Sequence, residues 1–188
     1  MNSGSVLLGF CFLLVSLPAA QSAPRDVADY FLALPEALYE QWDSGPTLDR
    51  EERESLIARA REGDPKVEGV ILLDVRNGYL QVAGSDSGER QTLTMALFRR
   101  PDGSALLALT ADETFEQREE QGGGEATDFF GFYEVVGGQW KDLTPILAGD
   151  WPRKDRYYEL PRYGRTIRIL DRGRDRLLIS KKAGVDFS

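Results

Sequence analysis

The segment 90–111, called here the central hairpin, constrains the fold more than any other part of the chain, because it is predicted to be a β-hairpin with two apolar faces. Pro-Asp-Gly at 101–103 separates its two apolar runs and favours a three-residue turn with a bulge. This turn sets the pairing, so that Met95 lies opposite Leu109. One face then carries Leu93, Met95, Leu97, Leu107 and Leu109, and the other carries Ala96, Phe98, Leu106 and Ala108. Such a hairpin needs cover on both sides.

The N-terminal segment has the pattern of a secretory signal peptide. An apolar run covers 6–18, and small residues follow it within 19–23. The run is shorter than the ~20 residues that a membrane-spanning helix needs. We therefore expect removal of residues 1–23, a single globular domain over 24–188, and a secreted or periplasmic location.

The residue types that are missing exclude several chemistries. The chain has no histidine, and its single cysteine, Cys11, lies in the predicted signal peptide. The processed chain can therefore form no disulfide, and the usual serine, cysteine and zinc hydrolase sites are excluded. No phosphate loop or dinucleotide-binding motif is present. Carboxylates remain, but Asp128 and Glu134 lie roughly 20 Å apart along one strand, too far for a paired-carboxylate site. We expect no cofactor, no metal and no catalytic role.

Residues 24–64 are predicted to be helical. Asp26 can cap a short first helix, whose apolar residues recur at helical spacing. A longer helix is predicted over 47–62, with either Thr47 or Asp49 as its cap, and Asp49 and Glu52 have the spacing of a capping box. The apolar stripe of this helix is narrow and the rest of its surface is charged, as is typical of a solvent-exposed helix. We expect the helices to cover one face of the central hairpin.

Three further hairpins are predicted in the mainly antiparallel β region, 65–188. Their turns are predicted at 77–78, 137–138 and 172–174. The turns set three pairings: Leu73 with Val82, Val135 with Trp140, and Ile169 with Leu177. Residues 144–164 are predicted to be a linker that leads to the last hairpin.

Some finer features of the β region also carry expectations. Two polar stretches, 84–89 and 112–126, are predicted to be loops, and the first lacks the alternating ligands of a calcium loop. Gly131, between two phenylalanines, marks either a bulge or the close approach of another backbone. The turn at 137–138 places Glu134 opposite Lys141, which predicts a cross-strand ion pair.

Four successive hairpins predict an α+β fold, in which N-terminal helices pack on an antiparallel meander of about eight strands. Because both faces of the central hairpin need cover, we expect this sheet to be strongly curled or closed, as in a partly closed barrel. The material that covers its second face, either packed side chains or a ligand, then bears directly on function.

The net charge of −8 is unevenly distributed. From Asp150 to the end the chain has 11 basic and 6 acidic residues, with aromatic residues between the arginines. Such a segment either binds an anionic surface or pairs with the acidic rest of the protein, and the net acidic charge argues against nucleic acid. The aromatic residues of 129–140 either line a ligand pocket or fill the core. The candidate contact residues are Phe130, Phe132, Tyr133, Trp140, Trp151, Arg153, Tyr157, Tyr158, Arg162 and Arg168.

These features favour an exported, non-catalytic β-rich domain that binds a protein or cell-envelope partner. The alternative is a carrier of a small apolar ligand or lipid, held in a cavity of the curled sheet. A carboxylate-based acid–base hydrolase is the least supported hypothesis.

Overall fold

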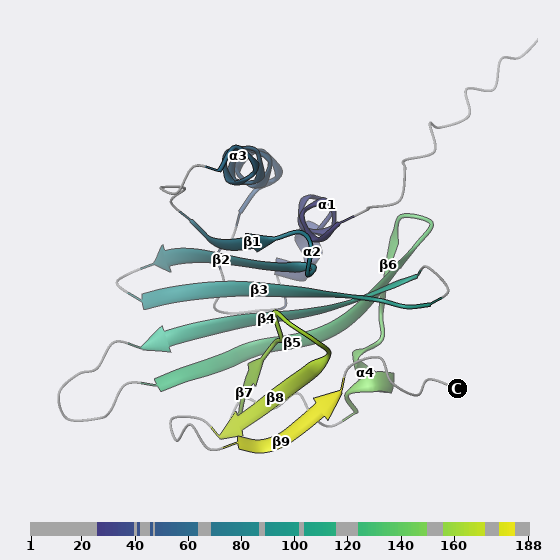
Figure 1. Ribbon diagram of the computed structural model, residues 1–188. Coiled ribbons are helices and arrows are strands. Elements are labelled where there is room, and N and C mark those ends of the chain that lie inside the picture. Colours follow the sequence, from purple (N-terminus) through teal and green to yellow (C-terminus); the bar gives the residue numbers. More distant parts are fainter. Residues whose placement is uncertain are drawn as a thin grey trace, which may run out of the picture.

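A computed structural model of the protein shows a long central sheet with helices on one side and a smaller sheet on the other (Figure 1). The structure describes residues 26–39, 41, 46, 48–63, 69–86, 89–101, 104–115, 124–149, 156–171 and 177–182. The predicted signal peptide lies outside these residues. The helices are α1 (Val27–Leu32), α2 (Glu36–Tyr39), α3 (Arg50–Arg61) and α4 (Thr144–Leu147). The strands are β1 (Val70–Asp74), β2 (Tyr79–Asp86), β3 (Glu89–Arg99), β4 (Ala105–Phe115), β5 (Gly124–Val136), β6 (Gln139–Asp142), β7 (Arg156–Glu159), β8 (Thr166–Asp171) and β9 (Leu177–Lys182).

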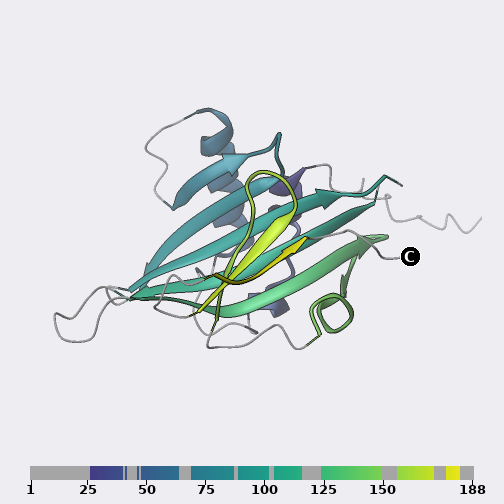
Figure 2. The ribbon, with the colours of Figure 1, turned by 60° about the horizontal axis from the view of Figure 1, so that its bottom comes forward.

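The strands form two separate antiparallel sheets. Strands β1 to β6 pair in chain order as an open meander, and β7, β8 and β9 form the smaller sheet. The α+β class, the N-terminal helices and the antiparallel meander are therefore confirmed. The expectation of a single closed or curled sheet of about eight strands is wrong, because the second face of the meander is covered by another layer. Figure 2 shows the smaller sheet lying across the long strands, with α1 and α3 behind them.

The meander ends at β6 for a local reason. Asp142 Oδ1 accepts a hydrogen bond from Thr144 N (2.7 Å), and Thr144 Oγ1 accepts one from Phe132 N (2.9 Å). Pro145 follows in the first turn of α4 and has no backbone N–H with which to extend a strand. The chain thus leaves the sheet here. The predicted linker 144–164 is wrong in part, because it contains α4 and β7.

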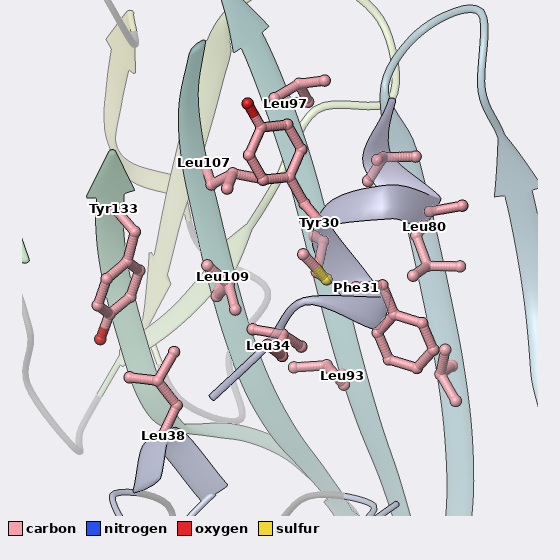
Figure 3. Close-up of a cluster of buried hydrophobic side chains, with 14 of the residues drawn as sticks. Tyr30, Phe31, Leu34, Leu38, Leu80, Leu93, Leu97, Leu107, Leu109 and Tyr133 are labelled. Atoms are coloured by element: carbon pink, nitrogen blue, oxygen red, sulfur yellow. The ribbon is translucent and has the colours of Figure 1, made fainter. Parts of the chain in front are cut away.

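The central hairpin has the predicted register, with Met95 opposite Leu109 and Phe98 opposite Leu106. Its first apolar face packs against the helices and forms one buried cluster (Figure 3). In this cluster Tyr30, Phe31 and Leu34 lie over the leucines of β2, β3 and β4. The helices therefore cover one face of the central hairpin, as predicted.

The second face of the central hairpin belongs to another buried cluster. Ala96, Phe98, Leu106 and Ala108 pack there with residues of β5, α4 and the smaller sheet. Ile167 and Ile169 of β8 are fully buried in this cluster. Side chains of the chain itself thus cover both faces of the hairpin.

The helix caps are as predicted. The Asp26 side chain accepts hydrogen bonds from Ala28 N (2.8 Å) and Asp29 N (3.0 Å) at the start of α1. Asp49 and Glu52 form the predicted capping box at the start of α3, with Glu52 N donating to Asp49 Oδ1 at 2.8 Å. These caps satisfy backbone N–H groups that have no partner within a helix.

An unexpected feature of α3 is Arg53, which is only 2% exposed. Its Nη1 donates to Phe31 O (3.0 Å) and Leu34 O (2.8 Å), and its guanidinium lies 5.6 Å from the centre of the Tyr39 ring. The carbonyl groups at the end of α1 carry partial negative charge, which favours a cation there. Arg53 thus links α3 to α1 and α2 from inside the core.

The β1–β2 hairpin differs from the predicted register by two residues. Leu73 pairs with Leu80 rather than with Val82, so the connection is a four-residue turn over 75–78. Hydrogen bonds favour this longer turn, because Asp74 accepts from the backbone and side-chain nitrogens of Asn77, and Gly78 adopts a φ of 69°. A shift of two leaves every side chain on its predicted face, since strand side chains alternate with a period of two.

The β8–β9 hairpin shows the same kind of difference. Ile169 pairs with Ile179 rather than with Leu177, and the register shifts after this pair. The predicted turn at 172–174 lies outside the described residues. The prediction is therefore wrong in register but places Ile169 on the apolar face, as observed.

The β5–β6 hairpin has its predicted register, with Val135 opposite Trp140 and Glu134 opposite Lys141. The carboxylate of Glu134, however, pairs with Arg100 of the neighbouring turn. At Gly131 neither predicted feature is found, because the irregularity of β5 lies nearer its start, opposite Ala111 and Asp112. Instead, an added Cβ at Gly131 would lie 2.7 Å from Tyr133 Cε2, so this glycine makes room for an aromatic ring.

The two predicted polar loops are shorter than expected. Strand β2 continues to Asp86 and β3 begins at Glu89, while β4 continues to Phe115 and β5 begins at Gly124. Strand pairing therefore continues into both polar stretches, because hydrogen bonds between backbone groups do not depend on the polarity of the side chains. Within the described part of the chain, no helix is long and apolar enough to cross a membrane.

Candidate functional site

The predicted aromatic cluster is divided between the two faces of the sheet. Phe130 and Phe132 lie in the cluster under the smaller sheet, whereas Tyr133 and Trp140 lie in or against the cluster under the helices. Phe130 stacks on Tyr158 of β7, with ring centres 4.5 Å apart. These residues therefore do not converge on one pocket, and each packs against the chain itself.

Trp140 connects β6 to the helical layer. Its Nε1 donates to Ala33 O at 3.1 Å, and its ring makes edge contacts with Tyr30 and Tyr133 at centre distances of 6.3 and 5.9 Å. Burial raises the pKa of the Tyr133 hydroxyl above its ordinary value, and the charge of Asp142 acts in the same direction. The arrangement holds α1 against the edge of the meander.

The predicted basic segment is only partly described. Trp151 and Arg153 lie outside the described residues, Tyr158 is buried, and Tyr157 is half-buried. Arg168 pairs with Glu159 on the neighbouring strand. Arg162, Arg165 and Arg168 of this segment thus form contacts within the protein.

One group of arginines does gather at a surface, where the β1–β2 turn, the end of β3 and the β7–β8 turn meet. This group, called here the arginine surface, consists of Val75, Arg76, Arg162, Tyr163 and Arg165, whereas the Arg99 side chain lies on the same face of β3 as Leu97, toward the helices. Tyr163 is 67% exposed and Val75 is 37% exposed. The basic segment predicted from the sequence contains Arg162, Tyr163 and Arg165, but nothing in the sequence indicated that Val75 and Arg76, in a turn distant in the chain, lie beside them.

Hydrogen bonds hold the three parts of the arginine surface together. Arg162 Nε donates to Asp74 Oδ2 at 2.8 Å, Arg165 Nη2 donates to Arg99 O at 2.6 Å, and Leu97 N donates to Gly78 O at 2.7 Å. The Arg162 guanidinium also lies 5.1 Å from the centre of the Tyr163 ring. The surface is therefore built by contacts between elements and does not depend on one loop.

The Asp74–Arg162 ion pair determines the electrostatics that the structure resolves at this surface. Hydrogen bonds from Asn77 and then from Arg162 lower the pKa of Asp74 below its ordinary value, and Asp74 raises the pKa of Arg162 in turn. Asp74 is the ion-pair partner of Arg162 on this surface.

A buried polar group that sequence reasoning missed lies between the two sheets. Asp112, 6% exposed, accepts hydrogen bonds from Thr110 Oγ1 (2.9 Å) and from Thr127 Oγ1. Thr127 Oγ1 in turn accepts from Tyr158 N of β7 at 3.0 Å. Strand alternation, which places Thr110 and Asp112 on the same face as Leu106, could have indicated this group. Its contacts connect β4, β5 and β7, and so fix the smaller sheet on the meander.

Within the described residues, no group of three histidine, cysteine, aspartate or glutamate side chains could hold a metal ion. The chain matches no family model, no curated protein and no solved structure. The residues themselves are therefore the basis for a functional proposal.

Proposed function

We propose that this protein is an exported, non-catalytic domain that binds a protein or cell-envelope partner through its outer surface. The observation that supports this proposal is the packing of both faces of the central hairpin by the chain's own side chains. In a carrier, one face of such a sheet lines a cavity for the ligand. Here Phe98 and Leu106, on the second face, are buried against α4 and the smaller sheet.

The aromatic residues lead to the same proposal. A ligand pocket places its aromatic side chains around a common space. Phe130 and Phe132 lie on one face of β5 and Tyr133 on the other, so they serve two cores rather than one cavity. Binding through exposed side chains is therefore favoured over enclosure of a small ligand.

The proposal can be tested by site-specific photo-crosslinking of the full chain in a cell that exports it. A photoreactive residue is placed in turn at Tyr163, at Ile146 of α4 (75% exposed) and at Glu54 of α3, one in each surface region. A binding domain should give a discrete crosslinked product with another macromolecule from at least one position. No product from any position, together with a small molecule released on denaturation and seen by mass spectrometry, would refute the proposal and support a carrier.

A further inference from the structure

We propose that Asn77 is a site of slow, spontaneous deamidation, and that the folded protein restrains this reaction through Asp74 and Arg162. The inference does not depend on the proposed function. It starts from the dipeptide Asn77-Gly78 in the turn between β1 and β2, where Asn77 is exposed. Because glycine has no Cβ, its backbone nitrogen can approach the side chain of a preceding asparagine more closely than that of other residues.

The reaction converts a neutral amide into a carboxylate. The backbone nitrogen of Gly78 attacks Cγ of Asn77, so that an N–Cγ bond forms and the Cγ–Nδ2 bond breaks. The side-chain nitrogen leaves as ammonia with the proton of the Gly78 N–H, and a cyclic succinimide remains. Water then opens this ring at either carbonyl carbon and gives aspartate or isoaspartate. Water is the only other reactant.

The fold requires glycine at the position that makes Asn77 reactive. Gly78 has a φ of 69°, and an added Cβ would lie 2.9 Å from both Cβ and O of Leu97. The Gly78 carbonyl oxygen also accepts a hydrogen bond from Leu97 N at 2.7 Å. A side chain at position 78 would therefore strain the turn and disturb its contact with β3.

Hydrogen bonds hold the atoms that would react. Asn77 Nδ2, the leaving group, donates to Asp74 Oδ2 at 2.9 Å, and Asn77 N donates to Asp74 Oδ1 at 3.2 Å. The attacking atom, Gly78 N, donates to Val75 O at 3.2 Å. Attack requires Gly78 N to give up this hydrogen bond, and ring closure draws the Asn77 side chain away from Asp74. The reaction therefore proceeds from a locally open turn, and its rate follows the population of that open state.

Arg162 connects this restraint to the smaller sheet. From the turn between β7 and β8, Arg162 Nε donates to the same oxygen, Asp74 Oδ2, at 2.8 Å. A hydrogen bond between two charged groups is stronger than one between neutral groups. Arg162 thus helps to fix Asp74 and lowers the population of the open turn. The deamidation rate of Asn77 then depends on whether the smaller sheet is in place.

The composition of the chain makes the reaction easy to follow. The sequence contains two asparagines, and the other one, Asn2, lies in the predicted signal peptide. The processed protein is incubated at neutral pH, and ion-exchange chromatography separates the more acidic product. Peptide mapping locates the change, with Asn77→Asp as the standard for the aspartate product. We expect deamidation of the wild type to be about tenfold or more slower in buffer than in a denaturing concentration of urea.

Two substitutions test the restraint. Asp74→Ala should speed deamidation of the folded protein by roughly three- to tenfold, because it removes the acceptor of the Asn77 side chain. Arg162→Met leaves the turn itself unchanged and should speed the reaction by about twofold or more. The matched control is Arg168→Met, which removes an ion pair with Glu159 within the smaller sheet and should keep the wild-type rate.

Arg53→Met controls for a general loss of stability, because it removes hydrogen bonds in the helical layer and leaves the turn intact. Circular dichroism establishes that each variant is folded. If Asp74→Ala does not fold, the comparison of Arg162→Met with Arg168→Met decides the question.

Three results would contradict the inference. A wild type that does not deamidate even in urea would exclude the site. Equal rates in buffer and in urea would exclude protection by the fold. Rates for Asp74→Ala and Arg162→Met that match those of Arg53→Met and Arg168→Met would exclude the role of Asp74 and Arg162.

Discussion

The buried guanidinium of Arg53 leads to the most specific prediction about stability. We expect Arg53→Met to remove the link between α3 and the α1–α2 connection while it keeps a long apolar side chain in the core. In the wild type, Arg53 Nη1 donates to Phe31 O at 3.0 Å and to Leu34 O at 2.8 Å, and the variant removes this donor. Because both carbonyl groups meet Arg53 in a buried region, water cannot replace the donor without opening the core.

The magnitude follows from the number and kind of hydrogen bonds. A hydrogen bond from a charged donor contributes about 1.5–3 kcal/mol to the free energy of unfolding, and the variant loses two short ones. Burial of the apolar methionine side chain compensates for part of this loss. We expect the free energy of unfolding to fall by about 3 kcal/mol, which lowers the Tm by about 10 °C for a chain of this size. Arg53→Lys, whose ammonium can still donate to one or both carbonyl groups, should lose roughly half as much.

Urea unfolding followed by tryptophan fluorescence measures this effect, since Trp140 is hydrogen-bonded to Ala33 beside the affected segment. The control is Arg50→Met on the same helix, whose ion pair with Glu54 is largely exposed and should contribute about 0.5 kcal/mol or less. An Arg53→Met variant as stable as Arg50→Met would refute the reasoning.

Three further predictions concern the sheets. Gly131→Ala should destabilise the protein by about 1–3 kcal/mol, because the new Cβ meets the Tyr133 ring, and the loss should shrink in a Tyr133→Leu background. Thr127→Val should lower the free energy of unfolding by about 2–3 kcal/mol, since it removes the hydroxyl between Tyr158 N and Asp112, whereas Thr127→Ser should stay near wild type; equal losses would contradict this role. The third concerns pH. The pKa of Asp74 in the folded protein lies below its ordinary value of 3.8. The ionised Asp74 therefore stabilises the fold above pH 3.8, and this stabilisation is lost as the pH falls through the pKa of the folded protein. Urea midpoints between neutral and acid pH should therefore fall less for Asp74→Asn than for wild type, and parallel curves would count against the Asp74–Arg162 pair.

Local sequence chemistry predicted a large part of the fold. The predicted turn at 101–103 implies the register that the central hairpin has, and the capping residues Asp26 and Asp49 mark where two helices begin. Each of these features depends on residues that are close in the chain, so side-chain type and spacing are sufficient to predict it.

The remaining features depend on contacts between distant residues. Hydrophobic alternation places Leu73 and Ile169 on the correct faces but cannot distinguish registers that differ by two. Strands β7–β9 form a separate layer for two reasons. The meander ends before Pro145, and the second apolar face of the meander has to be covered by other residues. Arg53 lies four residues before the buried Ile57 and therefore on the same face of α3. This spacing indicates a buried position for Arg53, although a charged residue is not usually expected there.

The candidate site was even harder to predict from the sequence, for the same reason. Arg162 was predicted from the composition of its own segment, but its partner Asp74 lies 88 residues earlier. Arg76 belongs to the β1–β2 turn, which no local pattern relates to Arg162. Only the topology brings them together.

The order of strands in the meander also has a kinetic consequence. Strands β1 to β6 each pair with the next strand along the chain, so each pairing closes only a short loop. The contact between Arg162 and Asp74, by contrast, must wait for a much longer segment to be in place. The smaller sheet is therefore expected to dock last, and a chain truncated before Arg156 would expose Phe98 and Leu106. Such a fragment should aggregate rather than persist as a smaller folded domain.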